Sequence, residues 1–179
     1  MESNHKNEAE ENRQDFTGEE AIAKLRDLVE SAQTCFFCTE GRSSGGSAGA
    51  RPMAVQQVDD EGTLWFLSAD DSLKNEEVGR DPFVRLYFQG SAHSEFLALG
   101  GVATISRDKE KIRELWEGVM QTWFTEGVDD PRITVIRVVP TEAYYWDDKH
   151  GTLIAGIKKV IAAVTGKTSD DFVEGKLSV

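Results

Sequence analysis

Apolar residues recur along this chain with two different periods, and each period predicts a different kind of element. Apolar and polar side chains alternate in stretches that are typical of strands with one buried face. Turn residues separate these stretches, which lie at 35–39, 51–58, 63–67, 83–89, 95–106 and 132–146, the last interrupted at Pro140. Most of the connections are shorter than the dozen or so residues that a parallel crossover needs. The sheet is therefore predicted to be antiparallel, and the fold class mainly β.

Helical spacing of apolar residues predicts the elements that flank the strands. This spacing gives each helix one apolar face, at 19–32, 109–121 and 153–165. Thr17 and Glu20 have the spacing of a capping box at the start of the first helix. Ser72 has a side chain suited to cap a shorter helix that follows it, over about 73–79.

The length of the chain, 179 residues, suits one domain of ordinary size. Residues 1–16 are polar and charged with almost nothing to bury, so we expect a disordered acidic tail there. Residues 17–166 form the predicted domain, and residues 167–179 a flexible C-terminal tail. Within the domain, residues 41–50 (GRSSGGSAGA) have the composition of a mobile loop.

The charge of the chain limits its partners. Asp and Glu number 32 against 20 Lys and Arg, for a net charge of −12, which argues against general affinity for nucleic acid or anionic membranes. The chain has no apolar run near 18 residues and no secretory signal at its start. We therefore expect a cytoplasmic protein.

Cysteine and histidine residues do not form a recognisable reactive centre. Cys35 and Cys38 have CxxC spacing, but on a strand residues three apart point to opposite faces. No second Cys pair or nearby His completes a metal site, so we interpret both as buried structural cysteines. His5, His93 and His150 have no carboxylate partner at motif spacing. No catalytic residue and no metal ligand is therefore assigned.

The stretch from 51 to 74 brings together side chains that are suited to hold phosphate. Arg51 begins one predicted strand, Ser68 ends the next, and Ser72 and Lys74 open the short helix. The start of a helix presents unpaired N–H groups and the positive end of the helix dipole to an anion. Spacing alone also fits the alternative that Arg51 and Lys74 are ordinary solvated surface cations.

Several motifs in order resemble the FMN-binding split β-barrel proteins related to pyridoxamine 5′-phosphate oxidase, and most of all their general stress protein 26 branch. The motifs are Arg-Pro-Met at 51–53, LWFL at 64–67, Ser-x-Lys at 72–74, FLALGGVA at 96–103, DKEKIRELW at 108–116, WFTEGVDDP at 123–131 and AYYW at 143–146. The resemblance extends over about residues 21–166. It implies a six-stranded antiparallel split β-barrel and a homodimer that holds FMN between its subunits.

The resemblance also implies which residues contact the cofactor. The phosphate of FMN is expected at Arg51, Ser68, Ser72 and Lys74, with FAD left open as an alternative cofactor. The flavin ring is expected along the backbone of Phe66 and Leu67, near Met53. Trp123 and Phe124, large apolar groups in an irregular segment, are the candidates to close the site from the second subunit.

The resemblance implies an FMN-dependent oxidoreductase acting on a small substrate. The same residues fit a protein that stores or senses FMN without turnover, and a haem-binding protein with His93 or His150 as axial ligand is a further alternative. Gly100 and Thr125 stand where the family often has Ser and Pro. The basic substrate-binding residues of the oxidases have no counterpart after Trp146, so their pyridoxal-forming activity is not expected here.

Overall fold

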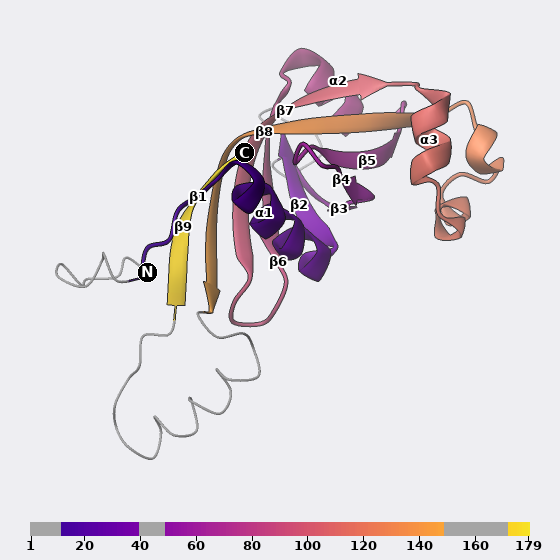
Figure 1. Ribbon diagram of the computed structural model, residues 1–179. Coiled ribbons are helices and arrows are strands. Elements are labelled where there is room, and N and C mark those ends of the chain that lie inside the picture. Colours follow the sequence, from indigo (N-terminus) through magenta and orange to yellow (C-terminus); the bar gives the residue numbers. More distant parts are fainter. Residues whose placement is uncertain (1–11, 40–48, 149–171) are drawn as a thin grey trace.

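The computed structural model describes residues 12–39, 49–148 and 172–179, and its main element is a curved sheet of nine strands (Figure 1). The strands are β1 (Phe16–Thr17), β2 (Thr34–Thr39), β3 (Ala50–Ala54), β4 (Gln57–Val58), β5 (Leu64–Ala69), β6 (Phe83–Gln89), β7 (Phe96–Ser106), β8 (Ile133–Asp148) and β9 (Phe172–Ser178). The helices are α1 (Gly18–Ala32), α2 (Leu73–Arg80) and α3 (Lys109–Leu115), with two 3-10 turns, η1 (Gly118–Thr122) and η2 (Gly127–Asp129). The chain is mainly β, as predicted.

The long strand β8 connects the parts of the sheet. It pairs with β7 along most of its length, with β5 through its first half and with β9 through its second half. The sequence predicted a break at Pro140, but the strand continues through it. The ladder shifts its register between Gly100 and Gly101 on the facing strand, and this irregularity accommodates a residue that has no N–H to donate.

The sheet differs in detail from the expected six-stranded antiparallel barrel. It has nine strands in the order β1-β9-β8-β7-β6-β2-β3, with β5 on β8 and β4 on β5. One pair, β1 with β9, is parallel. The hydrogen-bonded ladder is not closed, because β3 and β4 follow one another along the chain and do not pair. The strands added at the β8 edge come from the two ends of the chain.

Both predicted tails are partly ordered, which corrects their assignment as disordered and flexible. Residues 172–178 of the expected C-terminal tail form β9. Within the expected N-terminal tail, the amide of Gln14 donates to the carbonyl of Glu174 at 2.9 Å, and Phe16 belongs to β1. These short segments bury little by themselves, so the sequence pattern did not reveal them. Strand β9 pairs with β8 on one side and with the N-terminal segment on the other, and β1 pairs with β9.

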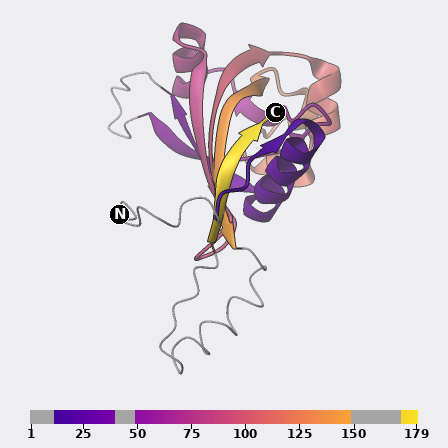
Figure 2. The same ribbon diagram turned by 60° about the vertical axis from the view of Figure 1, so that its left-hand side comes forward.

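The main core lies between the sheet and α1. Helix α1 buries one apolar face (Ala21, Leu25, Leu28 and Val29), which packs with inward side chains such as Phe37, Phe66 and Leu86. Figure 2 shows α1, in indigo, lying along one side of the curved sheet. Thr17 is the N-cap residue, as expected, but its side chain makes no capping hydrogen bond, so the predicted capping box is absent.

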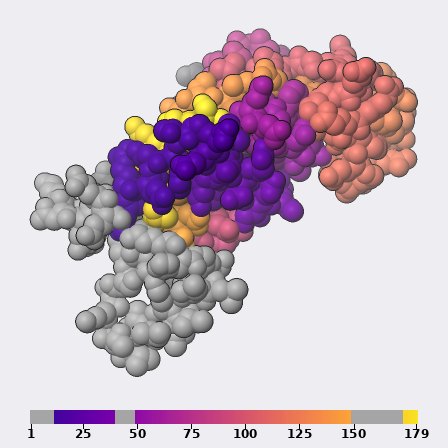
Figure 3. Space-filling model, in the orientation of Figure 1, coloured from indigo at the N-terminus to yellow at the C-terminus, as the bar shows by residue number. Residues whose placement is uncertain are grey.

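The segment between β7 and β8 forms a lobe with its own small core. The predicted helix at 109–121 ends early, because α3 stops at Leu115 and η1 follows. Buried side chains from α3, η1, the residues after η1 and the neighbouring parts of β5 and β8 pack together here, among them Ile112, Met120 and Phe124. The lobe projects from the body in the space-filling view (Figure 3). The helix predicted at 153–165 lies outside the described residues.

No helix in the described parts of the chain combines the length and apolar character needed to cross a bilayer.

Candidate functional site

The junction of β5 and α2 has the local structure that the sequence predicted. Ser72 has extended backbone angles, and its hydroxyl accepts a hydrogen bond from the amide of Asn75, which makes it the N-cap of α2. Helix α2 continues to Arg80, and Asp81 and Pro82 follow it. This cap fixes the start of α2, and with it the direction in which Lys74 and Glu77 project.

Arg51 lies in a buried polar cluster built from three elements. It faces the same side of the sheet as its cross-strand partner Phe37, which is fully buried. Its Nη2 donates to Glu77 Oε2 on α2 at 2.7 Å, and Thr39 Oγ1 at the end of β2 donates to the same oxygen at 2.7 Å. The Glu77 side chain is 5% exposed. Arg51 is therefore an inward residue held by a buried carboxylate, and not a solvated surface cation.

One nitrogen of the Arg51 guanidinium has no hydrogen-bond partner among residues 12–39, 49–148 and 172–179. Nη1 is buried and donates no hydrogen bond to any described residue. Burial lowers the pKa of Lys74 below its ordinary value of 10.5, and the charge of Arg51 lowers it further. No described residue forms an ion pair with Lys74. The cluster thus contains two cations, Arg51 and Lys74, and one carboxylate, Glu77. One donor of Arg51, Nη1, is unsatisfied within the described residues.

Ser68 and Ser72 belong to a different network. Ser68 is buried, and its hydroxyl donates to Asn75 Oδ1 at 2.7 Å. Asn75 Nδ2 donates in turn to Thr134 Oγ1 at 2.9 Å, and Thr134 donates to the carbonyl of Ser68 at 3.0 Å. No hydrogen bond between described residues joins this network to Arg51 or Lys74. The four residues predicted to bind phosphate are therefore divided into two groups.

One edge of β5 is without a strand partner beyond Trp65 in the described part of the chain. Strand β4 pairs with β5 only at Leu64 and Trp65, so Phe66 and Leu67 have no described strand partner on that side. The ring of Phe66 is buried in the core against Phe37, with ring centroids 5.5 Å apart. Only backbone atoms of Phe66 are therefore available to a ligand. Met53 is half-buried at the margin of the same core.

The predicted pair Trp123 and Phe124 is divided by the structure. Phe124 is 5% exposed and packs in the lobe core near Trp116, with ring centroids 6.4 Å apart. Trp123 is 63% exposed and lines a groove of about 620 Å³ with residues of α1, β3 and β4. Of the two, only Trp123 is free to contact another molecule.

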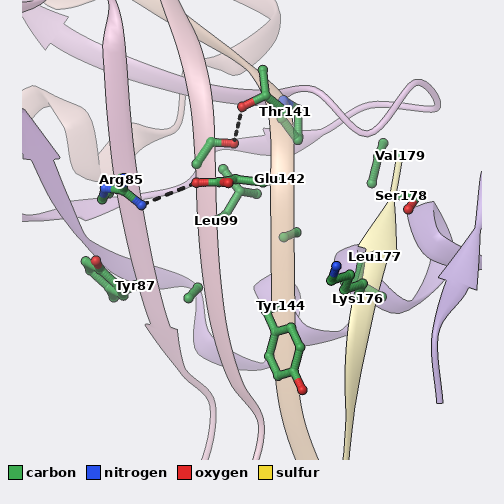
Figure 4. Close-up of a pocket in the computed structure, with 14 residues that line it drawn as sticks. Arg85, Tyr87, Leu99, Thr141, Glu142, Tyr144, Lys176, Leu177, Ser178 and Val179 are labelled. Atoms are coloured by element: carbon green, nitrogen blue, oxygen red, sulfur yellow. Dashed lines mark hydrogen bonds and ion pairs between the residues drawn. The ribbon is translucent and has the colours of Figure 1, made fainter. Parts of the chain in front are cut away.

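The outer face of the sheet carries exposed aromatic side chains and two shallow hollows. Phe36, Tyr87 and Ala98 are opposite one another on neighbouring strands, and Phe36 and Tyr87 are 59% and 46% exposed. One hollow, of about 560 Å³, also includes Trp146. The other, of about 450 Å³, appears in Figure 4, where Arg85 Nη1 donates to Glu142 Oε1 at 3.3 Å across β7. Exposed aromatic side chains of this kind are common where proteins contact other molecules.

The cysteines and the described histidine lie outside the cluster. Cys35 is buried, and burial raises the pKa of its thiol to about 12. Cys38 is half-buried, and burial raises its pKa as well, so neither thiol is activated. His93 is exposed in the turn after β6. His5 and His150 lie outside the described residues, within which no group of three acidic, Cys or His side chains could hold a metal ion.

Sequence reasoning missed Glu77, Thr39 and Asn75. Glu77 follows Lys74 by three residues on α2, and this spacing places the two on one face of a helix. That spacing was the available signal for Glu77. Thr39 and Asn75 gave none, because their roles depend on contacts between elements that are distant in sequence.

Comparison with known proteins identifies the family. Residues 20–170 match the family model described as pyridoxamine 5′-phosphate oxidase like. The chain belongs to this family. Among curated proteins, protein bli-3 of Neurospora crassa is 27% identical over 105 residues, which are 54% of this chain and 50% of that protein. The match therefore spans half the length of this curated relative.

Solved structures share the fold of this family member. A putative general stress protein 26 from Jannaschia sp. CCS1 has a TM-score of 0.70 at 22% identity and covers 90% of this chain and 100% of its own. A general stress FMN/FAD binding protein from Xanthomonas citri has a TM-score of 0.59 at 24% identity over 70% of this chain and 87% of its own. A putative pyridoxamine 5′-phosphate oxidase from Listeria innocua has a TM-score of 0.55 at 27% identity and covers 68% of this chain and 94% of its own. The family resemblance stated from the motifs is thus confirmed.

Proposed function

We propose that this chain binds FMN and that Arg51 and Lys74 hold its phosphate. The observation that carries the proposal is the buried Nη1 of Arg51, which lacks a hydrogen-bond partner among the described residues. An unpaired buried donor costs about 1–3 kcal/mol, which a phosphate oxygen would offset. Guanidinium and ammonium groups are also the side chains best suited to phosphate. The cluster fits a terminal phosphate, which favours FMN over FAD.

The open edge of β5 supports a place for the flavin ring. Backbone groups of Phe66 and Leu67 lie on the strand that leads into α2, and Met53 lies on the strand that carries Arg51. In our proposal the ring lies along this edge, with Met53 close to it. Among the relatives, the Xanthomonas citri protein is named for binding FMN or FAD, which supports a flavin at this site.

We further propose that two copies of the chain form a homodimer that encloses the flavin. The exposed aromatic face around Phe36, Tyr87 and Trp146 supports an interface, because a second copy would remove this apolar surface from water. Trp123 is the candidate to cover the ring from the second copy, since it is exposed on a projecting lobe. Phe124 is no longer proposed as a contact, because it fills the lobe core.

The proposed activity is that of an FMN-dependent oxidoreductase on a small substrate. A bound flavin supplies the redox chemistry, and the protein binds and orients it. The alternative is a protein that stores or senses flavin. The rate of flavin reduction distinguishes the two. In an oxidoreductase, NADH or NADPH should reduce the bound flavin faster than it reduces free FMN. Equal rates would favour storage or sensing.

Titration of the protein with FMN, followed by flavin fluorescence, tests the site. Charge-assisted hydrogen bonds contribute about 1.5–3 kcal/mol, so Arg51→Ala and Lys74→Ala should each weaken FMN binding by about one to two powers of ten. Arg80→Ala is the matched control, because Arg80 is an exposed cation on the same helix. Unchanged FMN affinity in both Arg51→Ala and Lys74→Ala would overturn the proposed site.

A further inference from the structure

Glu77 is an unexpected residue in a cluster that would bind an anion. Its carboxylate is almost fully buried, and it lies in contact with the arginine proposed to bind phosphate. A buried negative charge at this position opposes the approach of a phosphate. The position of Glu77 therefore calls for a role other than attracting the ligand.

The hydrogen bonds of Glu77 suggest that role. A single oxygen, Oε2, accepts from Arg51 Nη2 and from Thr39 Oγ1, so one carboxylate joins α2 to β3 and to the end of β2. Burial raises the pKa of Glu77, but these two hydrogen bonds and the Arg51 charge lower it below the ordinary value of 4.5. Glu77 is therefore ionised at neutral pH and keeps both contacts.

Holding Nη2 determines which edge of the guanidinium faces the ligand. An arginine side chain has many rotamers, and fixing one of them costs conformational entropy whenever a ligand binds. Glu77 fixes the guanidinium before binding, with Nη2 bonded to its carboxylate and Nη1 without a partner in the described parts of the chain. The same arrangement leaves Lys74 without an ion pair to Glu77. The two donors toward the ligand are thus Nη1 and the Lys74 ammonium.

We infer that Glu77 is a positioning residue, whose acceptor oxygen orients Arg51 so that Nη1 meets the phosphate. This inference rests on the proposed FMN site. According to this inference, the acceptor oxygen of Glu77 strengthens phosphate binding because it orients Arg51. The negative charge of Glu77 weakens phosphate binding because it repels the anion. Removing the acceptor and removing only the charge should therefore have opposite effects on phosphate binding.

Two substitutions separate these effects. Glu77→Ala removes the acceptor and should weaken FMN binding about tenfold, because Arg51 is no longer held. Glu77→Gln keeps an acceptor oxygen for Arg51 and Thr39 without the charge, so FMN should bind at least as tightly as to the wild type. Glu76→Ala, at an exposed neighbouring position on α2, should leave FMN affinity unchanged.

The experiment measures dissociation constants for FMN and for riboflavin by fluorescence titration of the full chain. Riboflavin lacks the phosphate, so its affinity should be equal in all variants, and this equality also shows that the variants are folded. Wild-type FMN affinity in Glu77→Ala would overturn the inference, as would a loss in Glu77→Gln as large as that in Glu77→Ala. Equal wild-type affinity for FMN and riboflavin would instead overturn the proposed phosphate site itself.

Discussion

Tyr145 and Gln14 join the N-terminal segment of the chain to the long strand β8. The hydroxyl of Tyr145 on β8 donates to the carbonyl of Gln14 at 2.8 Å. The ring of Tyr145 is fully buried, and burial raises the pKa of its hydroxyl to about 12. Beside it, Gly175 of β9 lies so close to the N-terminal segment that an added Cβ would be 1.9 Å from the same carbonyl oxygen.

The close approach of Gly175 predicts that Gly175→Ala destabilises the protein. The new methyl group cannot fit without displacing the backbone at Gln14, and strain of this kind typically costs about 1–3 kcal/mol. Chemical denaturation followed by tryptophan fluorescence measures the loss. Gly79→Ala is the matched control, since a Cβ there has no atom within 4 Å and Ala favours a helix. Equal stability of the two variants would contradict the close contact.

The lowered pKa of Lys74 predicts how flavin binding depends on pH. A phosphate favours the charged ammonium, so FMN affinity should fall as pH rises through the pKa of Lys74 in the free protein. Because burial and the Arg51 charge place that pKa below 10.5, the fall should begin at a lower pH than for an exposed lysine. Fluorescence titrations across alkaline pH measure it. Lys74→Met should lack this step, and a step of equal size in Lys74→Met would assign it to another group.

The network around Asn75 predicts that Ser68 acts on stability more than on binding. Ser68→Ala removes a hydrogen bond from buried Asn75 and should lower the free energy of unfolding by about 1–2 kcal/mol. FMN affinity should change by less than about threefold, an energy below 1 kcal/mol. Ser106→Ala, at an exposed position that ends β7, serves as control. A tenfold loss of FMN affinity at wild-type stability would restore Ser68 as a phosphate ligand.

Trp123 and Phe124 are adjacent in the sequence, but substituting them should affect stability and flavin binding differently. Phe124→Ala empties the centre of the lobe core and should cost about 3–5 kcal/mol of unfolding free energy. Trp123→Ala should cost little stability, because the side chain is 63% exposed. In the proposed dimer, Trp123→Ala should instead reduce the quenching of bound flavin. Unaltered quenching, or a large loss of stability, would show that Trp123 does not cover the ring.

The aromatic face of the sheet predicts the effect of a charge at Phe36. Phe36→Glu should convert the proposed dimer to monomer, because a carboxylate would lie between apolar side chains of two copies. Light scattering measures the mass, and FMN affinity should fall with it. Ser106→Glu adds the same charge at an exposed position and serves as control. A wild-type protein that is monomeric and still binds FMN fully would contradict the proposed interface.

The sequence alone determined the elements whose signals are local. Alternating side chains located most strands, and the Ser72 cap of α2 follows from the preference of a hydroxyl for a helix start. The ordered motifs gave the family, since they require no knowledge of contacts. Strands β1 and β9 were not predicted. Strand β1 has only two residues, and β9 contains a glycine that interrupts its alternation of apolar and polar side chains. Strand β1 is ordered by pairing with β9, and β9 by pairing with β8 along six residues and with β1 at its end.

Only the tertiary structure decided which polar residues share a site. Arg51 and Glu77 are far apart in the sequence, and their contact depends on how α2 packs against β7 and β2. The same packing assigned Ser68 to Asn75 and separated it from Arg51. It also buried Phe124 and left Trp123 exposed. Residue type and spacing define which groups are able to bind phosphate, whereas burial and the geometry of each hydrogen bond decide which donors remain unpaired.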